Sequence, residues 1–189
     1  MKTLLAGLIT LASASSALAA CKIAGPDNAK VTIEEFADFH CGYCAKGSQA
    51  MKQVVKAYPT EVKIVYRNLP LPFHDPGATT AAKAFSAACI QDPQQAHQLQ
   101  NSLFETQERL VKEGDSYLFE AAKTAGLDVE KLKTDMKGAK VAKDLQEDQK
   151  AAERLGIKGT PSFLIGKEVV VGARPFSDYQ KVIEKQLGR

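Results

Sequence analysis

Cysteine, histidine and net charge are all scarce in this sequence. Its 189 residues include four cysteines and three histidines, and the formal net charge is only +3. So few cysteines exclude a small domain that is held together by many disulfides. No block of basic residues is present, which argues against binding to nucleic acid. The 44% hydrophobic composition suits a single domain with a substantial core.

The sequence also lacks the pattern of a structural metal site. Cys41 and Cys44 form its single CxxC pair, and no HxxxH spacing occurs. A zinc site would require a second short pair of ligands, and covalent haem attachment would require histidine at position 45, which is Ala45. We therefore expect neither a metal nor another cofactor.

Residues 1–20 have the features of a signal peptide. Lys2 supplies positive charge, Leu4 to Leu11 form an apolar segment, and small residues follow up to Ala20. The apolar segment is too short for a permanent membrane span. We expect export to the periplasm or cell envelope, where disulfides persist.

The residues before Cys21 allow two kinds of processing. Ala17-Leu18-Ala19 fits an ordinary cleavage site, whereas Leu18-Ala19-Ala20-Cys21 resembles the bacterial lipobox, in which the cysteine is lipidated. Lipidation of Cys21 would anchor the protein to a membrane. The alternative is a free or incidental cysteine, and the sequence leaves both open.

Hydrophobic periodicity predicts an α/β domain over residues 21–189. Strand patterns occur at 31–36 and 61–69, on either side of a helix at 41–57, so the two strands should be parallel. A helical insertion follows at about 75–150, with one of its helices marked by Leu99 to Val111. Cys89 falls on a buried stripe of this block and should act as a small hydrophobe. A hairpin at 162–165 and 168–171 and a helix from Phe176 to Leu187 complete a mixed sheet covered by helices.

Cys41 and Cys44 stand where the first strand pattern gives way to a helix. Two residues three positions apart at a helix start lie about 5–6 Å apart at Cα, which is the spacing a disulfide requires. The free N–H groups at that helix end favour the thiolate of Cys41. A structural disulfide is the alternative, but one that closes so short a loop would stabilise little. We interpret the pair as a reversible redox dithiol.

Two segments and the insertion together resemble DsbA-like thiol–disulfide oxidoreductases of the thioredoxin superfamily, over about residues 27–187. The segments are Glu35-Phe36-Ala37-Asp38-Phe39-His40-Cys41-Gly42-Tyr43-Cys44 and Gly159-Thr160-Pro161-Ser162-Phe163. The resemblance implies a thioredoxin fold with a helical insertion. It also implies a cis peptide bond at Thr160-Pro161 beside the dithiol, where the backbone of Thr160 would bind an extended substrate strand.

The resemblance further implies a role for Glu35, six residues before Cys41. A partly buried acid at this position would transfer a proton to and from Cys44, with a pKa raised by desolvation. A solvated Glu35 is the alternative, and Asp38 and Glu34 are rivals for the role. His40 and His74 would either tune Cys41 by charge or be structural.

By this resemblance, the protein is an exported oxidoreductase that introduces disulfides into reduced or unfolded exported proteins. Cys41 would be the exposed nucleophile, Cys44 would resolve the mixed disulfide, and a membrane redox partner would reset the pair. Gly42-Tyr43 differs from the Pro-His pair of the strongly oxidising members of the family. The threonine before the proline, Thr160, is more similar to the residue that isomerase members have there. A reductase or isomerase that a membrane partner keeps reduced is therefore the alternative. An oxidase is the leading hypothesis, because no separate dimerisation domain precedes the catalytic one.

Two functions of another class stay open. A substrate-holding module would use the strand-binding groove without turnover, but the intact Cys41 and Cys44 argue against it. A metallochaperone would bind Cu(I) through the same thiols, but no tract rich in methionine or histidine supports it. Replacing Cys41 by serine separates both from an oxidoreductase.

Overall fold

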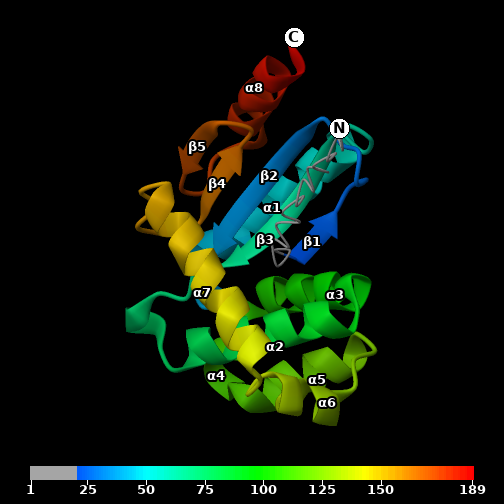
Figure 1. Ribbon diagram of the computed structural model, residues 1–189, viewed down its shortest axis with the longest axis vertical. Helices are drawn as coiled ribbons and strands as arrows, with labels where there is room; N and C mark the ends of the chain where they lie inside the picture. The colour runs from blue at the N-terminus through cyan, green and yellow to red at the C-terminus, as the bar shows by residue number, and fades with distance from the viewer. Residues whose placement is uncertain (1–20) are drawn as a thin grey trace, which may run out of the picture.

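The computed structural model describes residues 21–189, and the expected signal peptide at 1–20 lies outside this range. Its centre is a mixed sheet of five strands in the order β1-β3-β2-β4-β5 (Figure 1). The strands are β1 (Cys21–Ala24), β2 (Val31–Ala37), β3 (Val62–Asn68), β4 (Ser162–Ile165) and β5 (Glu168–Val171). β2 and β3 are parallel and joined through α1 (Gly42–Ala57), and the other pairs are antiparallel. The predicted α/β class is confirmed, although β1 was missed.

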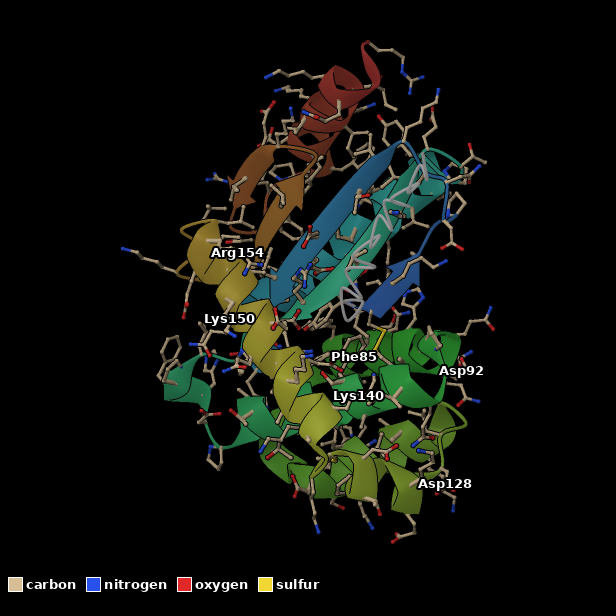
Figure 2. All side chains as sticks on the ribbon, in the orientation of Figure 1. Phe85, Asp92, Asp128, Lys140, Lys150 and Arg154 are labelled. Atoms are coloured by element: carbon tan, nitrogen blue, oxygen red, sulfur yellow. A yellow bond between two sulfur atoms is a disulfide. The ribbon has the colours of Figure 1, made fainter. Side chains whose placement is uncertain are left out.

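Six helices lie between β3 and β4, and α8 (Phe176–Leu187) ends the chain. They are α2 (Gly77–Gln91), α3 (Pro93–Glu105), α4 (Gln107–Glu113), α5 (Asp115–Thr124), α6 (Val129–Asp135) and α7 (Ala139–Arg154), preceded by the short 3-10 turn η1 (Pro72–His74). Asp92 and Asp128, labelled in Figure 2, cap α3 and α6 by accepting backbone N–H groups. Within residues 21–189, no helix is long and apolar enough to cross a membrane.

The single helix expected over Leu99 to Val111 is wrong, because the chain breaks at Thr106. Residue 106 has φ of −122°, outside the helical region, and separates α3 from α4. Its hydroxyl donates to the carbonyl of Ser102 and also contacts the hydroxyl of Tyr117. Apolar periodicity continues across this break, so it concealed the change of direction.

The two faces of β2 carry different chemistry. Figure 1 shows α7 crossing one face of the sheet, with α1 behind the other. Phe36 packs with Ala151 and Ala152 of α7. Glu35 points the other way, toward α1, because successive strand residues alternate between faces. This alternation decides which acid of β2 lies beneath the CxxC helix.

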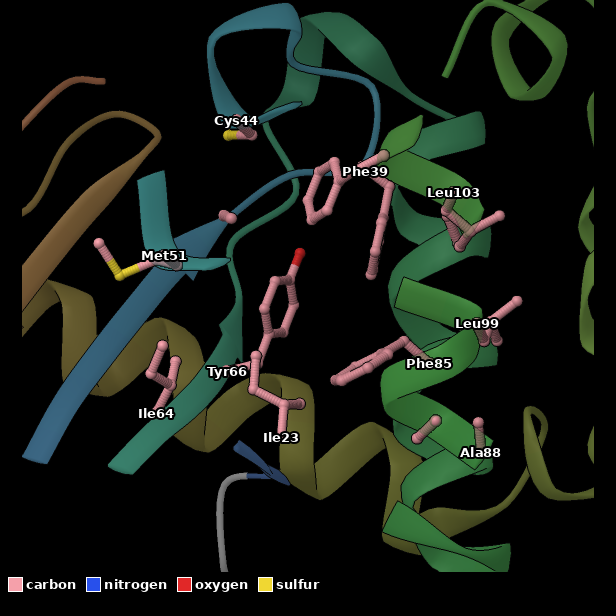
Figure 3. Close-up of a cluster of buried hydrophobic side chains, with 14 of the residues drawn as sticks. Ile23, Phe39, Cys44, Met51, Ile64, Tyr66, Phe85, Ala88, Leu99 and Leu103 are labelled. Atoms are coloured by element: carbon pink, nitrogen blue, oxygen red, sulfur yellow. The ribbon is translucent and has the colours of Figure 1, made fainter. Parts of the chain in front are cut away.

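An aromatic cluster joins the sheet to the helical insertion. Phe39 stacks on Tyr66 and on Phe104, with ring centroids 5.3 and 5.0 Å apart, and Phe85 packs against both Phe39 and Tyr66. Figure 3 shows the hydroxyl end of Tyr66 directed toward Phe39 and Cys44. Fully buried aromatic pairs of this kind contribute beyond the area they bury. The cluster fixes the turn between β2 and α1.

A disulfide between Cys21 and Cys89 corrects two expectations. It links β1 to α2 across 68 residues, with a Cα–Cα distance of 5.9 Å (Figure 2). Lipidation of Cys21 is wrong for this structure, because a lipid would occupy the same sulfur. Cys89 is half-buried and covalently paired, so it is not a simple buried hydrophobe. The pairing follows from the antiparallel addition of β1 beside β3.

Candidate active site

Cys41 and Cys44 lie at the start of α1, where the strand-to-helix turn places them. Cys41 is the N-cap residue, with an extended backbone, and both cysteines are free thiols. Cys44 is completely buried, whereas 7% of Cys41 is exposed. The expectation of an exposed Cys41 is therefore right only relative to Cys44. Of the two cysteines, Cys41 is thus the one that solvent reaches.

The two thiols have opposite acidities. A hydrogen bond from Cys44 is the main reason that the pKa of Cys41 falls from 9.0 to about 5, against the opposing effect of burial. The backbone N–H groups of Cys44 and Tyr43 at the helix start lower it further. Burial, followed by the hydrogen bond to Cys41, raises the pKa of Cys44 far above its usual value. At neutral pH, Cys41 is the thiolate and Cys44 carries the proton.

The Thr160-Pro161 peptide bond is cis, as expected. Sγ of Cys41 lies 3.6 Å from the carbonyl oxygen of Thr160, to which Cys41 donates a hydrogen bond when it is protonated. Gly47 of α1 lets this loop approach closely, because a Cβ at that position would lie 3.0 Å from Phe163 and 3.2 Å from Pro161. Segments 41–44 and 160–161 thus meet in one site.

The hydroxyl of Thr160 is buried in this site. Within the described chain, its oxygen has no hydrogen-bond partner. It lowers the pKa of both Cys41 and Cys44, because a free hydroxyl near a sulfur can donate to the thiolate. Threonine therefore supplies a donor that valine would not.

Glu35 is the acid that the fold places beneath α1. Neither of its carboxyl oxygens has a hydrogen-bond partner among residues 21–189, and burial raises its pKa to about 8. It borders a cavity of about 300 Å³ whose lining includes Ser48 and Met51 of α1 and Gln100 of α3. The predicted burial and raised pKa are confirmed, so the alternative of a solvated glutamate is wrong.

Glu34, a rival for the role of Glu35, faces the opposite side of the sheet. It forms an ion pair with Arg67, whose guanidinium also donates to the buried Asp148 at 3.0 Å. Asp148 in turn accepts the backbone N–H of Asn68 at 2.9 Å. This network ties β2 and β3 to α7 and is separate from the thiols.

Asp38, the other rival, has a buried carboxylate that is fully engaged. It accepts hydrogen bonds from the backbone N–H of His40 at 2.7 Å and of Leu71 at 2.9 Å, and its Oδ2 lies 2.8 Å from Nδ1 of His74. His74 is therefore structural, and the ring of His40 packs over Gly77, where a Cβ would lie 2.4 Å from it. The carboxylate of Asp38 is thus committed to local donors.

Gln107 supports the site in a way that the sequence did not indicate. From the first position of α4, its side-chain amide donates to the carbonyls of Phe39 at 2.7 Å and Cys41 at 3.0 Å. The helical insertion therefore holds the turn that carries the nucleophile. A glutamine at a helix start carries no sequence signal for such a role.

No group of three or more metal-ligating side chains gathers anywhere in residues 21–189. Residues that could contact a partner do stand out. Tyr43, between the two cysteines, is 65% exposed, and Phe73, beside His74, is 77% exposed. The site as a whole combines the slightly exposed Cys41, the buried thiol of Cys44, the buried carboxyl of Glu35 and the adjacent cis-proline loop.

Comparison with known proteins connects this geometry to one family. A family model described as thioredoxin matches residues 21–185. Disulfide bond formation protein D of Bacillus subtilis is 25% identical over 169 residues, which are 87% of this chain and 76% of that protein. Na(+)/H(+) antiporter NhaA 3 of Salinispora tropica is 32% identical over 147 residues, which are 76% of this chain but 21% of the antiporter. The chain thus spans only about a fifth of the antiporters it matches.

Solved structures show the same similarity. A thioredoxin-like oxidoreductase from Silicibacter pomeroyi superposes with a TM-score of 0.73 at 28% identity, over 85% of this chain and 88% of that one. BdbD from Bacillus subtilis superposes with a TM-score of 0.75 at 25% identity, over 88% and 92% of the two chains. The catalytic domain of Proteus mirabilis ScsC, at 24% identity and a TM-score of 0.77 over 90% and 91%, supports the fold alone.

Proposed function

The chain belongs to the thioredoxin family, and from that premise we propose that it is an exported protein thiol–disulfide oxidoreductase that introduces disulfides into other proteins. The observation that carries the proposal is the pair of unlike thiols: Cys41 with a pKa of about 5 beside the buried, protonated Cys44. The similarity to a protein named for disulfide bond formation supports it.

The chemistry is two thiol–disulfide exchanges in sequence. A substrate thiolate attacks Sγ of Cys41 in the Cys41–Cys44 disulfide, and Cys44 leaves with the electron pair and takes up a proton. A second substrate thiolate then attacks the substrate sulfur of the mixed disulfide, and Cys41 leaves as a thiolate. The substrate loses two electrons and gains a disulfide, while the Cys41–Cys44 pair is reduced.

The acidity of Cys41 favours this direction. A stable thiolate is a good leaving group and stabilises the reduced protein, so the disulfide form is a stronger oxidant. A pKa of about 5 lies between the roughly 7 of thioredoxin and the roughly 3.5 of DsbA. We infer a moderately strong oxidant, which would use no cofactor and which a membrane redox partner would reset.

Glu35 would supply the proton that Cys44 takes up. With a pKa of about 8, its carboxyl is protonated at neutral pH and can act as a general acid toward a developing thiolate. Thr160 and Pro161 would bind an extended segment of a reduced or unfolded exported protein, whose backbone adds as a strand beside them. The exposed ring of Tyr43 would contact that segment.

A trapping experiment tests the proposal. The oxidised protein should form disulfides in reduced, denatured ribonuclease. Cys44→Ala is first converted to a mixed disulfide between Cys41 and glutathione; a ribonuclease thiolate should then attack Sγ of Cys41, release glutathione and leave a mixed disulfide between Cys41 and ribonuclease. Cys41→Ala is the matched control and should form no adduct. If both variants bind the unfolded chain equally well without a covalent adduct, the protein is a holding module. Stoichiometric Cu(I) on the reduced protein, without exchange, would instead indicate a metallochaperone.

Net disulfide transfer distinguishes oxidase from isomerase. The hydroxyl of Thr160, buried beside both sulfurs, is the observation that keeps the isomerase alternative. An isomerase would reactivate ribonuclease that carries scrambled disulfides faster than it would oxidise the reduced chain. An oxidase would show the reverse order of rates.

A further inference from the structure

Asp38 contacts both cysteines through its backbone. Its N–H donates to Sγ of Cys44 at 3.4 Å, and its carbonyl accepts the N–H of Cys41 at 3.1 Å. The ladder between β2 and β3 ends at the pair Ala37 and Asn68. The carbonyl of Ala37, on the same peptide as the N–H of residue 38, still accepts the N–H of Leu69 at 2.9 Å, so the sheet holds one side of this peptide.

The carboxylate of Asp38 holds the other side of this peptide, at the Cα of residue 38. Oδ1 accepts the N–H of His40, and Oδ2 is shared by the N–H of Leu71 and by Nδ1 of His74. The side chain of Asp38 is completely buried, whereas that of His74 is 24% exposed. One donor from the β2–α1 turn and two from the loop after β3 therefore hold the carboxylate in place, and with it the Cα next to the N–H that contacts Cys44.

We propose that Asp38 is a positioning residue, clamped by His74 and Leu71, whose backbone N–H stabilises the Cys44 thiolate when Cys44 leaves or attacks. The proposal rests on the proposed function. In the exchange reaction, a thiolate attacks Cys41, the Cys41–Cys44 bond breaks, and the electron pair goes to Cys44 before a proton arrives. The N–H of residue 38 is already directed at the sulfur on which this charge develops, as preorganised electrostatic stabilisation requires.

Two rates separate this role from a general structural one. Attack of glutathione on the oxidised protein expels Cys44, whereas alkylation of the reduced protein by iodoacetamide reports on the Cys41 thiolate. Asp38→Asn places an amide NH₂ opposite N–H donors, and His74→Ala removes one donor from the clamp. We expect each to slow the glutathione reaction about tenfold, equivalent to about 1.4 kcal/mol, and to change alkylation less than about twofold.

Matched variants complete the experiment. His74→Asn keeps an amide N–H near the position of Nδ1 and should restore most of the glutathione rate. Asp148→Asn alters an equally buried carboxylate of the β2–β3–α7 network and should change neither rate. Because His74 is partly exposed, His74→Ala keeps the test valid even where Asp38→Asn does not fold.

The outcomes are distinct. An unchanged glutathione rate in His74→Ala, or an equal loss of both rates, would overturn the clamp while leaving the redox function intact. A wild-type protein whose Cys41–Cys44 disulfide never forms or never reacts with glutathione would instead overturn the proposed function.

Discussion

Glu35 should make the stability of this protein depend on pH in a way that glutamine removes. Its pKa is 4.5 in a solvated chain and about 8 in the fold, because burial disfavours its charged form. The folded protein therefore binds a proton that the unfolded chain releases. Between these two values, unfolding becomes easier as the pH rises, since each added unit favours the ionised, unfolded state.

The magnitude follows from the two pKa values. From pH 5 to pH 7, the contribution of Glu35 to the free energy of unfolding falls by the equivalent of about 1.8 pKa units. At about 1.4 kcal/mol per pKa unit, this decrease is about 2.5 kcal/mol. Below the solvated pKa of 4.5, Glu35 no longer makes the free energy of unfolding depend on pH, and above pH 8 the loss of stability is complete. Glu35→Gln remains neutral throughout, so the difference in stability between the two proteins should change by this amount.

Urea denaturation at pH 5, 6, 7 and 8 measures the effect. Both proteins should carry Cys41→Ala and Cys44→Ala, so that the redox state does not vary while the Cys21–Cys89 disulfide remains. The comparison at each pH cancels the other titrating groups, including Asp148, whose pKa burial raises to about 6. Stability curves that stay parallel from pH 5 to pH 8 would refute the buried, unpartnered state of Glu35.

Two other predictions concern the cysteines. The thiolate absorbance of Cys41 near 240 nm should titrate with a midpoint at about pH 5. Cys44→Ala should raise this midpoint, because the strongest hydrogen bond to the thiolate is lost. An unchanged midpoint would assign the acidity to the helix start alone. Replacing Cys21 and Cys89 together by alanine should lower the free energy of unfolding by about 4 kcal/mol, as expected for a loop of 68 residues. The midpoint of the Cys41 titration should stay unchanged. A shifted midpoint would show that the disulfide also shapes the active site.

The sequence predicted the parts of the site that local pattern encodes. The strand, the CxxC pair and the helix start are contiguous, and the burial of Glu35 was implied by resemblance. Thr160-Pro161 came from resemblance, and its cis bond is confirmed. These features depend on neighbours in the chain or on a motif, so the sequence carries them directly.

Contacts between distant segments could not be predicted in the same way. The pairing of Cys21 with Cys89 depends on how β1 joins the sheet, and Cys21 adjoins a segment that resembles a lipobox. The bond between Asp38 and His74 depends on the course of the loop after β3. Gln107 reaches the turn before α1 only because α3 and α4 are separate helices. Each requires the tertiary arrangement.

The most direct test of the central claim is the redox equilibrium of Cys41 and Cys44 in glutathione buffers. The account predicts a potential closer to the roughly −120 mV of DsbA than to the roughly −270 mV of thioredoxin, because the Cys41 thiolate stabilises the reduced form. A potential near the thioredoxin value would contradict the oxidase and favour a reductase or isomerase. A pair that does not oxidise in any of these buffers would contradict the redox function itself.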